Sequence, residues 1–187
     1  MAKLYFRYGA MWSSKTANAL MVRYNYLEKW QKPIFLKPKT DTRDGHNRIV
    51  SRIGLEAECE FVEDFIRDFD SSKSSYDAII IDEVQFLKKE EVDFFARLTD
   101  TYKIPVLCYW LRTDYRSELF EGSRRLFELA DVIEEIPTVC WCGKRAHFNA
   151  RIDDGKITRI GEQVQLWGNE SYVSLCRRHY LSGEITL

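Results

Sequence analysis

Hydrophobic and polar positions along the chain follow two periods that alternate. Residues 3–8 alternate polar and apolar side chains and predict a strand ending at Gly9, whereas residues 15–30 carry apolar side chains at helical spacing. The same reading predicts further strands at 33–37, 78–81, 105–110 and 131–136, helices at 88–101 and 118–130, and an amphipathic stretch at 61–69. Strands that alternate with helices indicate an α/β fold with a mostly parallel sheet flanked by helices.

Other stretches interrupt this pattern. Residues 40–51 are mostly polar and predict a long loop, and the serine-rich residues 71–75 predict a solvent-exposed loop. Beyond Pro137 the chain changes to clustered cysteines, scattered glycines and short β-like runs at 156–160 and 163–167. We therefore expect one domain over 1–138 and a small subdomain over 139–187.

Composition narrows the class of protein. With 45% hydrophobic and 30% charged residues the chain can bury a core and is not disordered as a whole. Its formal net charge of −1 gives no general attraction for nucleic acid or an anionic membrane, so we expect neither as a partner. The N-terminal sequence lacks the features of a secretory or transit peptide, and five cysteines, an odd number, favour a reducing cytoplasm over a disulfide framework.

The first candidate site is G-A-M-W-S-S-K-T at 9–16, close to the phosphate-binding pattern G-x-x-x-x-G-K-[ST]. It follows a predicted strand and opens a predicted helix, as that pattern requires. Lys15 would neutralise the β- and γ-phosphates of a nucleotide, and the Thr16 hydroxyl would bind Mg²⁺. The alternative is an ordinary turn with a solvated lysine. Ser14 replaces the last glycine, which costs about 1–2 kcal/mol if its φ is positive and little if its φ is negative.

The second candidate is the pair Asp82-Glu83, which follows the apolar run 78–81. Open α/β sheets bind their ligands at the carboxyl ends of strands, where one carboxylate can hold Mg²⁺ and the other can accept a proton. The alternative is that both acids only cap a strand. Together with residues 9–16, the pair indicates a P-loop nucleotide enzyme.

The third candidate is a set of four residues, Cys140, Cys142, Cys176 and His179. Three thiolates and one imidazole form a closed tetrahedral ligand set that is typical of structural zinc. The alternative is a chance cluster of cysteines. Cys59 and Cys108 stand alone and are expected to be small buried hydrophobes, and His46 and His147 to be solvated residues rather than ligands.

The motifs together resemble the zinc-containing, P-loop (type II) thymidine kinases over essentially all 187 residues. The motifs that carry the resemblance are 9–16, K-P-K-T-D-T-R (37–43), I-D-E-V-Q-F (81–86), L-R-T-D-Y-R-S-E-L-F (111–120), C-W-C-G-K-R-A (140–146), G-E-Q-V-Q-L-W-G-N-E-S-Y (161–172) and C-R-R-H-Y (176–180). The resemblance implies a RecA-like P-loop domain with a zinc-bound lasso subdomain. It also implies transfer of the γ-phosphate of ATP to the 5′-hydroxyl of thymidine with Mg²⁺, a homotetramer, and inhibition by thymidine triphosphate.

The resemblance also implies roles for individual residues. Glu83 matches the general base, Asp82 lies beside it at the metal, and Arg43 and Arg151 match the basic catalytic helpers. The positions that match nucleotide-binding residues are Gly9, Ala10, Met11, Trp12, Ser13, Ser14, Lys15, Thr16, Asp82 and Gln85. Those that match the nucleoside pocket and its lasso are Met11, Phe86, Leu111, Tyr115, Phe120, Asn149, Gln163, Val164, Gln165, Leu166, Trp167 and Tyr172.

The departures from the family pattern concern mainly the nucleoside. Trp167 stands where the first glycine of a G-G pair is usual, Gln165 where an aliphatic is usual, and Asn149 in a stretch that faces the 5-position of the base. Deoxyuridine or a 5-modified pyrimidine therefore remains an alternative substrate. Two other functions also remain open: a P-loop ATPase that acts on nucleic acid through its zinc ribbon, and a nucleoside-binding protein whose Ser14 impairs catalysis.

Overall fold

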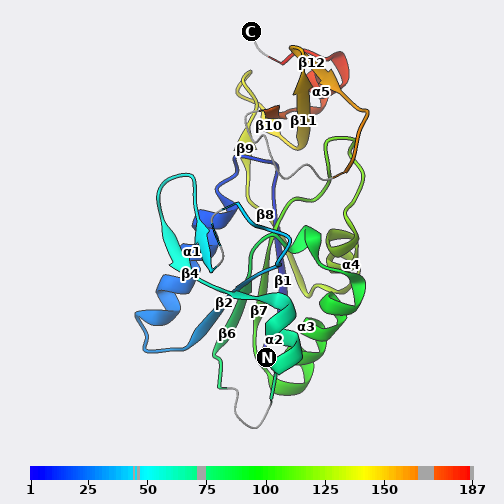
Figure 1. Ribbon diagram of the computed structural model, residues 1–187. Coiled ribbons are helices and arrows are strands. Elements are labelled where there is room, and N and C mark those ends of the chain that lie inside the picture. The colour runs from blue at the N-terminus through cyan, green and yellow to red at the C-terminus, as the bar shows by residue number, and fades with distance from the viewer. Residues whose placement is uncertain (44, 46, 71–74, 164–170, 186–187) are drawn as a thin grey trace.

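A six-stranded parallel sheet forms the centre of the protein (Figure 1). The computed structural model describes residues 1–43, 45, 47–70, 75–163 and 171–185. The strand order is β5-β2-β6-β7-β1-β8, and each neighbouring pair is parallel. The strands are β1 (Leu4–Tyr8), β2 (Pro33–Lys37), β5 (Glu60–Phe61), β6 (Ala78–Ile81), β7 (Val106–Trp110) and β8 (Val132–Glu135). The predicted α/β fold with a parallel sheet is confirmed.

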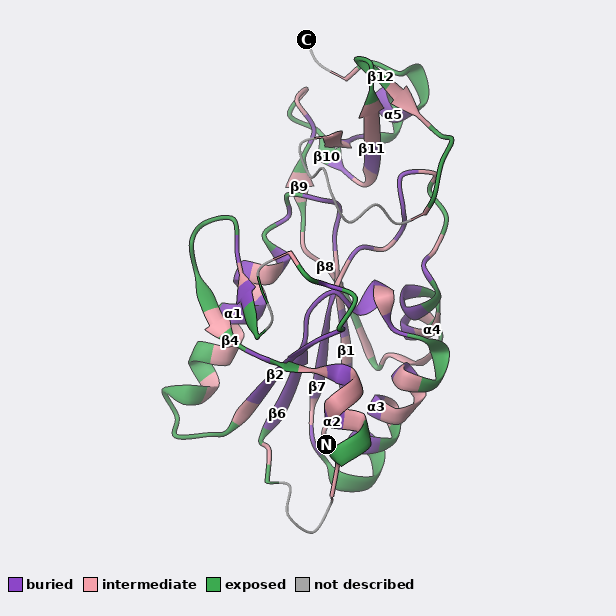
Figure 2. Ribbon diagram, viewed as in Figure 1, coloured by how far each residue is buried: buried purple, intermediate pink, exposed green. Residues whose placement is uncertain are grey.

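Helices cover both faces of this sheet. They are α1 (Lys15–Leu27), α2 (Val62–Asp68), α3 (Lys89–Tyr102), α4 (Glu121–Leu129) and the short 3₁₀ helix Val84–Phe86. In β6, Ile79 and Ile81 pack with α2, α3 and α4, whereas Ile80 packs with α1 on the opposite face. The four residues of β6 are completely buried (Figure 2), because a strand covered on both faces needs apolar side chains at every position.

A small hairpin extends beyond α1 and corrects the prediction of a loop over 40–51. Its strands β3 (Arg48–Val50) and β4 (Glu56–Glu58) pair antiparallel. Ile49 is buried and packs in the same core cluster as α1, which gives this polar segment one apolar anchor. A three-residue strand with one buried side chain is too short for its pattern to be recognised. Residues 71–74 of the predicted serine loop, and His46, lie outside the described residues.

The last part of the chain, which we call the C-terminal ribbon, comprises the described residues 138–163 and 171–185. Its elements are β9 (Thr138–Val139), β10 (Arg145–Ala146), β11 (Phe148–Asp153), β12 (Lys156–Thr158), β13 (Tyr172–Leu175) and α5 (Arg177–Ser182). The ribbon has a small core of its own, in which Ala150, Leu175 and Tyr180 are buried. It stands at the end of the sheet where β1 and β7 finish (Figure 1).

Most predicted element boundaries agree with the structure to within a few residues. Helix α4 begins at Glu121 rather than Glu118, because the Asp114 carboxylate accepts hydrogen bonds from the backbone N–H groups of Arg116 and Glu118. These bonds fold residues 114–118 into a turn. Of the β-like run at 156–160 only β12 is a strand, and the run at 163–167 lies outside the described residues from 164 onward. Among the helices described here, none combines the length and apolar character that crossing a membrane requires.

Candidate active site

Four loops meet where β1, β2, β6 and β7 end, and they form the candidate active site. They are residues 9–14 after β1, 38–43 after β2, Asp82-Glu83 after β6 and 111–120 after β7. The carboxyl ends of parallel strands lie at one edge of the sheet, where open α/β folds bind ligands. The fold therefore brings together four of the motifs that are far apart in the sequence.

The loop after β1 curls around the side chain of Lys15. Its Nζ donates hydrogen bonds to the Ala10 carbonyl at 2.7 Å and to Ser13 Oγ at 3.1 Å. Gly9 is required at the start of the loop, because a Cβ there would lie 2.3 Å from Ser13 Oγ and 2.4 Å from the Ile136 carbonyl oxygen. Lys15 opens α1, so the loop and the helix N-terminus form the arrangement that binds phosphate.

Ser14 adopts the left-handed conformation, with φ 57° and ψ 29°. The positive-φ case holds, and Ser14 carries the strain that a glycine would avoid. Its side chain makes no capping hydrogen bond to α1. Trp12, Glu83 and Ser117 also have positive φ, at 66°, 60° and 69°, so four strained non-glycine residues lie in the loops of the site. Strain of this kind is characteristic of functional sites.

Lys15 and Asp82 are both buried, and burial shifts their pKa values toward each other. Burial lowers the pKa of Lys15 to about 7, with Arg52 and Arg43 acting in the same direction and Asp82 opposing them. Burial raises the pKa of Asp82 to about 7, against the hydrogen bond from Thr16 and the charges of Arg43 and Lys15. A buried carboxylate bonded to a threonine hydroxyl, beside a phosphate-binding loop, fits a divalent cation that would restore its charged form.

Glu83 is held from two sides. Its Oε1 pairs with the Arg43 guanidinium, and its Oε2 accepts a hydrogen bond from Gln85 Nε2 at 2.8 Å. Arg43 is in turn fixed by Asp41, whose Oδ1 lies 2.7 Å from Arg43 Nε. Glu83 is only 3% exposed, so this carboxylate has a fixed position and direction.

Two cavities meet at Glu83. The first is lined by Met11, Arg43, Glu83, Gln85, Phe86, Trp110, Leu111, Asp114, Tyr115, Phe120, Asn149, Gln163 and Tyr172. The second is lined by Met11, Trp12, Ser14, Lys15, Thr16, Ala17, Asp41, Arg43, Ile49, Val50, Ser51, Arg52, Ile53, Asp82, Glu83 and Trp110. We call them the aromatic cavity and the phosphate cavity. They share Met11, Arg43, Glu83 and Trp110, so a group bound in one can reach a group bound in the other.

The structure places most of the predicted site residues in these cavities. The described residues predicted for the nucleoside pocket all line the aromatic cavity; they are Met11, Phe86, Leu111, Tyr115, Phe120, Asn149, Gln163 and Tyr172. Val164, Gln165, Leu166 and Trp167 lie outside the described residues. Gln85 lines the aromatic cavity rather than the phosphate cavity. Arg151 is not among the described residues lining either cavity; its guanidinium lies 5.4 Å from the centre of the Tyr115 ring.

Two further residues of the site, Trp110 and Arg52, were not predicted. Trp110 ends β7, lines both cavities, and has Lys15 Nζ and the Arg43 guanidinium 5.0 Å and 5.2 Å from its ring centre. Its position at the carboxyl end of a buried strand is the signal that would have found it. Arg52, in the hairpin, lies 3.4 Å from the centre of the Trp12 ring and lines the phosphate cavity. No sequence pattern pairs these two residues, because the contact depends on the hairpin.

Both polar groups of the Asn149 side chain are used in hydrogen bonds to backbone. They join the loop at residues 9–14, which we call the phosphate loop, to the loop after β7. Asn149 Oδ1 accepts the Met11 N–H at 2.8 Å, and Asn149 Nδ2 donates to the Thr113 carbonyl at 2.9 Å. The Ser174 hydroxyl donates to the Met11 carbonyl from the neighbouring strand β13. The C-terminal ribbon thus holds both backbone groups of Met11, which lines both cavities.

The four predicted metal ligands converge in the C-terminal ribbon. The ligand atoms of Cys140, Cys142, Cys176 and His179 lie within 4.8 Å of one another. Sγ of Cys140 and of Cys176 lie 3.3 Å and 3.5 Å from His179 Nδ1, and Cys142 Sγ lies 4.0 Å from Cys176 Sγ. A tetrahedral zinc ion separates two sulfurs by about 3.8 Å and a sulfur from a nitrogen by about 3.6 Å, so the donor set fits zinc.

The surroundings of this cluster orient His179. Trp141 stacks on the imidazole with ring centres 4.1 Å apart, and Glu184 lies 3.4 Å from Nε2, the nitrogen that faces away from the sulfurs. Such an outer partner fixes the ring of a metal-binding histidine. The lone cysteines Cys59 and Cys108 are buried, as predicted. His147 lies outside the cluster and contacts Glu135 at 2.9 Å.

Known proteins of one family are similar to this chain along nearly its whole length. A model of the thymidine kinase family matches residues 2–180. A thymidine kinase from Lactococcus lactis subsp. lactis (strain IL1403) is 44% identical over 189 residues, covering 99% of this chain and 100% of that protein. One from Lactiplantibacillus plantarum is 48% identical over 184 residues, covering 96% of each, and one from Zymomonas mobilis is 44% identical over 187 residues, covering 97% of each.

Proposed function

The chain belongs to the thymidine kinase family, and on that premise we propose how its residues carry out the reaction. The reaction transfers the γ-phosphate of ATP to the 5′-hydroxyl of thymidine and gives thymidine monophosphate, which salvages the free nucleoside. The observation that carries the assignment of roles is the position of Glu83 at the wall shared by the two cavities. There its carboxylate can accept a proton from a hydroxyl in one cavity while that hydroxyl attacks a phosphate in the other.

The phosphate cavity is proposed to hold ATP. Backbone N–H groups of residues 9–16 and the α1 N-terminus surround its phosphates, and Lys15 neutralises the β- and γ-phosphates. Thr16 and Asp82 would hold Mg²⁺, which supplies charge neutralisation between the β- and γ-phosphates. Bound phosphates favour the charged form of Lys15, whose ammonium is destabilised by burial in the free enzyme.

The aromatic cavity is proposed to hold the nucleoside. Among the described residues, the buried Gln85 Oε1 and Trp110 Nε1 have no hydrogen-bond partner, although both side chains line this cavity. Buried polar atoms are rarely left unpaired, so the pair favours a ligand that brings both a donor and an acceptor. A thymine ring has an N3–H donor and two carbonyl acceptors, and Phe86, Tyr115 and Tyr172 can pack around its faces.

Arg43 is proposed to act at the junction of the cavities. Paired with Glu83 and fixed by Asp41, it lies where negative charge develops on the transferred phosphate. Phosphoryl transfer depends on positioning and charge neutralisation, so a fixed arginine here supports the transition state. Arg151, the second predicted helper, lies beside Tyr115. We propose that it is the second basic residue that supports the reaction.

The remaining proposals concern organisation. The central sheet ends at Glu135, and the C-terminal ribbon has its own core, which supports a kinase domain over 1–138 and a zinc-bound subdomain over 139–187. With no open ligand position, the metal would stabilise this subdomain rather than take part in the reaction. We also propose a homotetramer. The exposed side chains of Met21, Tyr24 and Leu27 on α1 give an apolar surface suited to a subunit contact, and sedimentation equilibrium tests the stoichiometry.

The proposed function is tested by supplying γ-labelled ATP and Mg²⁺ with thymidine, deoxyuridine or deoxycytidine. Label should appear in thymidine monophosphate, and the rates with the three nucleosides establish the base preference. Absence of label in every nucleoside would overturn the proposal. In that case, ATP hydrolysis stimulated by DNA would support the nucleic-acid ATPase, and thymidine binding without turnover would support the impaired binding protein.

A further inference from the structure

Tyr180 lies outside both cavities, and contacts to its ring, its carbonyl and its hydroxyl fix its position. It directly follows the metal-ligand position His179 in α5 and is 2% exposed. Its ring stacks on Phe148 with centres 4.7 Å apart, and the Arg159 guanidinium lies 4.1 Å from the ring centre. Arg159 Nη2 also donates to the Tyr180 carbonyl at 2.7 Å. These contacts give the Tyr180 hydroxyl one direction.

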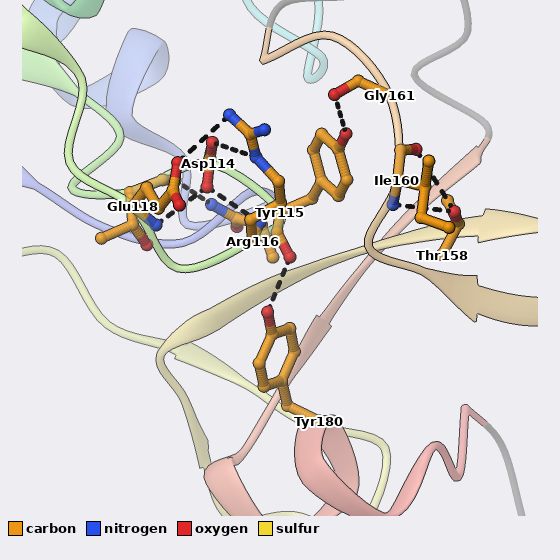
Figure 3. Close-up of polar contacts among 10 residues, drawn as sticks. Asp114, Tyr115, Arg116, Glu118, Thr158, Ile160, Gly161 and Tyr180 are labelled. Carbon is orange, nitrogen blue, oxygen red and sulfur yellow. Dashed lines mark hydrogen bonds and ion pairs between the residues drawn. The ribbon is translucent and has the colours of Figure 1, made fainter.

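That hydroxyl points at the loop that lines the aromatic cavity (Figure 3). It donates to the Tyr115 carbonyl at 2.7 Å, across 65 positions of sequence. Tyr115 is 1% exposed, and its own hydroxyl donates a hydrogen bond to the Gly161 carbonyl at 2.7 Å. The hydroxyl of Tyr180 therefore connects α5 to the loop after β7, and the hydroxyl of Tyr115 connects that loop to Gly161, beyond the end of β12.

Gly161 is the residue that permits this close approach. Its φ is +126°, a conformation that side chains disfavour, and a Cβ there would lie 3.2 Å from Arg151 Nη1 and 3.3 Å from the Tyr115 hydroxyl. Gln163, two residues further along, lines the aromatic cavity together with Tyr115. Both ends of the Tyr115 hydrogen bond to Gly161 thus lie within two residues of the cavity wall.

The loop after β7 has few other ties to the C-terminal ribbon. Its own turn is fixed internally by Asp114, which accepts the N–H groups of Arg116 and Glu118 (Figure 3). Among the described residues, the ribbon donates two hydrogen bonds to carbonyls of this loop: Asn149 to Thr113, and Tyr180 to Tyr115. Asn149 also accepts the Met11 N–H, whereas the Tyr180 hydroxyl bonds, among the described residues, to Tyr115.

We propose that Tyr180 is a positioning residue for the nucleoside, acting through Tyr115 and Gly161 to preset the wall of the aromatic cavity. The inference rests on the proposed function, since it assumes that the nucleoside occupies this cavity. A wall fixed before binding spares the ligand the cost of ordering it, so loss of the Tyr180 hydroxyl should weaken nucleoside binding. ATP lies against the phosphate loop and should be unaffected.

The test is Tyr180→Phe, which removes one hydroxyl and keeps the ring between its neighbours. Trp110 lines the cavity, so quenching of tryptophan fluorescence reports the Kd of thymidine without turnover. We expect the Kd of thymidine to rise about fivefold, the effect of losing one neutral hydrogen bond, with the Kd of ATP and kcat at saturation nearly unchanged. Tyr115→Phe should raise the Kd of thymidine in the same way, and the double variant should add little to either change.

The matched control is Tyr109→Phe, which removes the hydroxyl of another buried tyrosine. That hydroxyl accepts a hydrogen bond from Arg7 at 2.7 Å, and Tyr109 packs on the face of the sheet that α1 covers, opposite α4. Tyr109→Phe should lower the melting temperature without changing the Kd of thymidine. An unchanged Kd in Tyr180→Phe, beside a wild-type chain that binds thymidine, would overturn this inference alone. Equal losses of thymidine and ATP affinity would overturn it as well. A wild-type chain that does not bind thymidine would overturn the proposed function and this inference together.

Discussion

Ser14→Gly tests whether the altered position of the phosphate loop is strained. Ser14 has φ 57° and makes no side-chain hydrogen bond that caps α1, so the change removes a Cβ without removing such a bond. The left-handed conformation costs a non-glycine residue about 1–2 kcal/mol. Glycine makes the unfolded chain more flexible, which offsets about 0.4–1 kcal/mol of that gain. The net expectation is that Ser14→Gly stabilises the protein by about 0.5–1 kcal/mol.

For a protein of this length such a gain raises the melting temperature by about 1–4 °C, which differential scanning calorimetry resolves. Ser14→Ala retains the Cβ and should show no such gain. Trp30→Gly is the matched control outside the site, since Trp30 has φ 59° and is 95% exposed, and it should show a similar gain without any change in ATP affinity. A Ser14→Gly protein that melts below the wild type, or a Ser14→Ala protein that melts as high as Ser14→Gly, would refute the reasoning.

Two further predictions follow from the buried groups. Lys15→Met should abolish phosphoryl transfer and lower the melting temperature, because the buried Ala10 carbonyl and Ser13 Oγ lose the hydrogen bonds from Lys15 Nζ; an unchanged melting temperature would contradict this. Purified protein should contain one zinc ion per chain by elemental analysis. Cys176→Ser should lose the metal and melt at lower temperature, whereas Cys108→Ser, at a cysteine buried outside the cluster, should keep the metal. Equal metal content in the two variants would count against the zinc site.

The sheet could be predicted because its central strands are continuous runs of apolar residues. The run Ala78–Ile81 is buried on both faces, and Val106–Trp110 carries apolar side chains to both faces, so each needs apolar residues throughout. The hairpin at Arg48–Val50 could not be predicted in this way, because a single buried side chain, Ile49, anchors it. Short strands leave too few positions for a period to show.

The site was predictable where its residues form local motifs and unpredictable where they meet through the fold. Lys15, Glu83 and the four metal ligands each belong to a compact pattern. The left-handed conformation of Ser14 follows from how the loop closes around Lys15, and the sequence left both signs of φ open. The contact of Arg52 with Trp12 and the bond from Tyr180 to Tyr115 join segments far apart in the chain, so only the structure shows them.

The central claim is that Glu83 accepts the proton of the 5′-hydroxyl where the two cavities meet. The direct measurement is single-turnover formation of labelled thymidine monophosphate by the wild type and by Glu83→Gln, with the Kd values of ATP and thymidine measured on the same proteins. Glu83→Gln keeps the shape of the side chain but cannot accept the proton, so the rate should fall by about 10²–10⁴-fold with little change in the Kd of ATP. A Glu83→Gln protein that forms thymidine monophosphate at the wild-type rate would contradict the account.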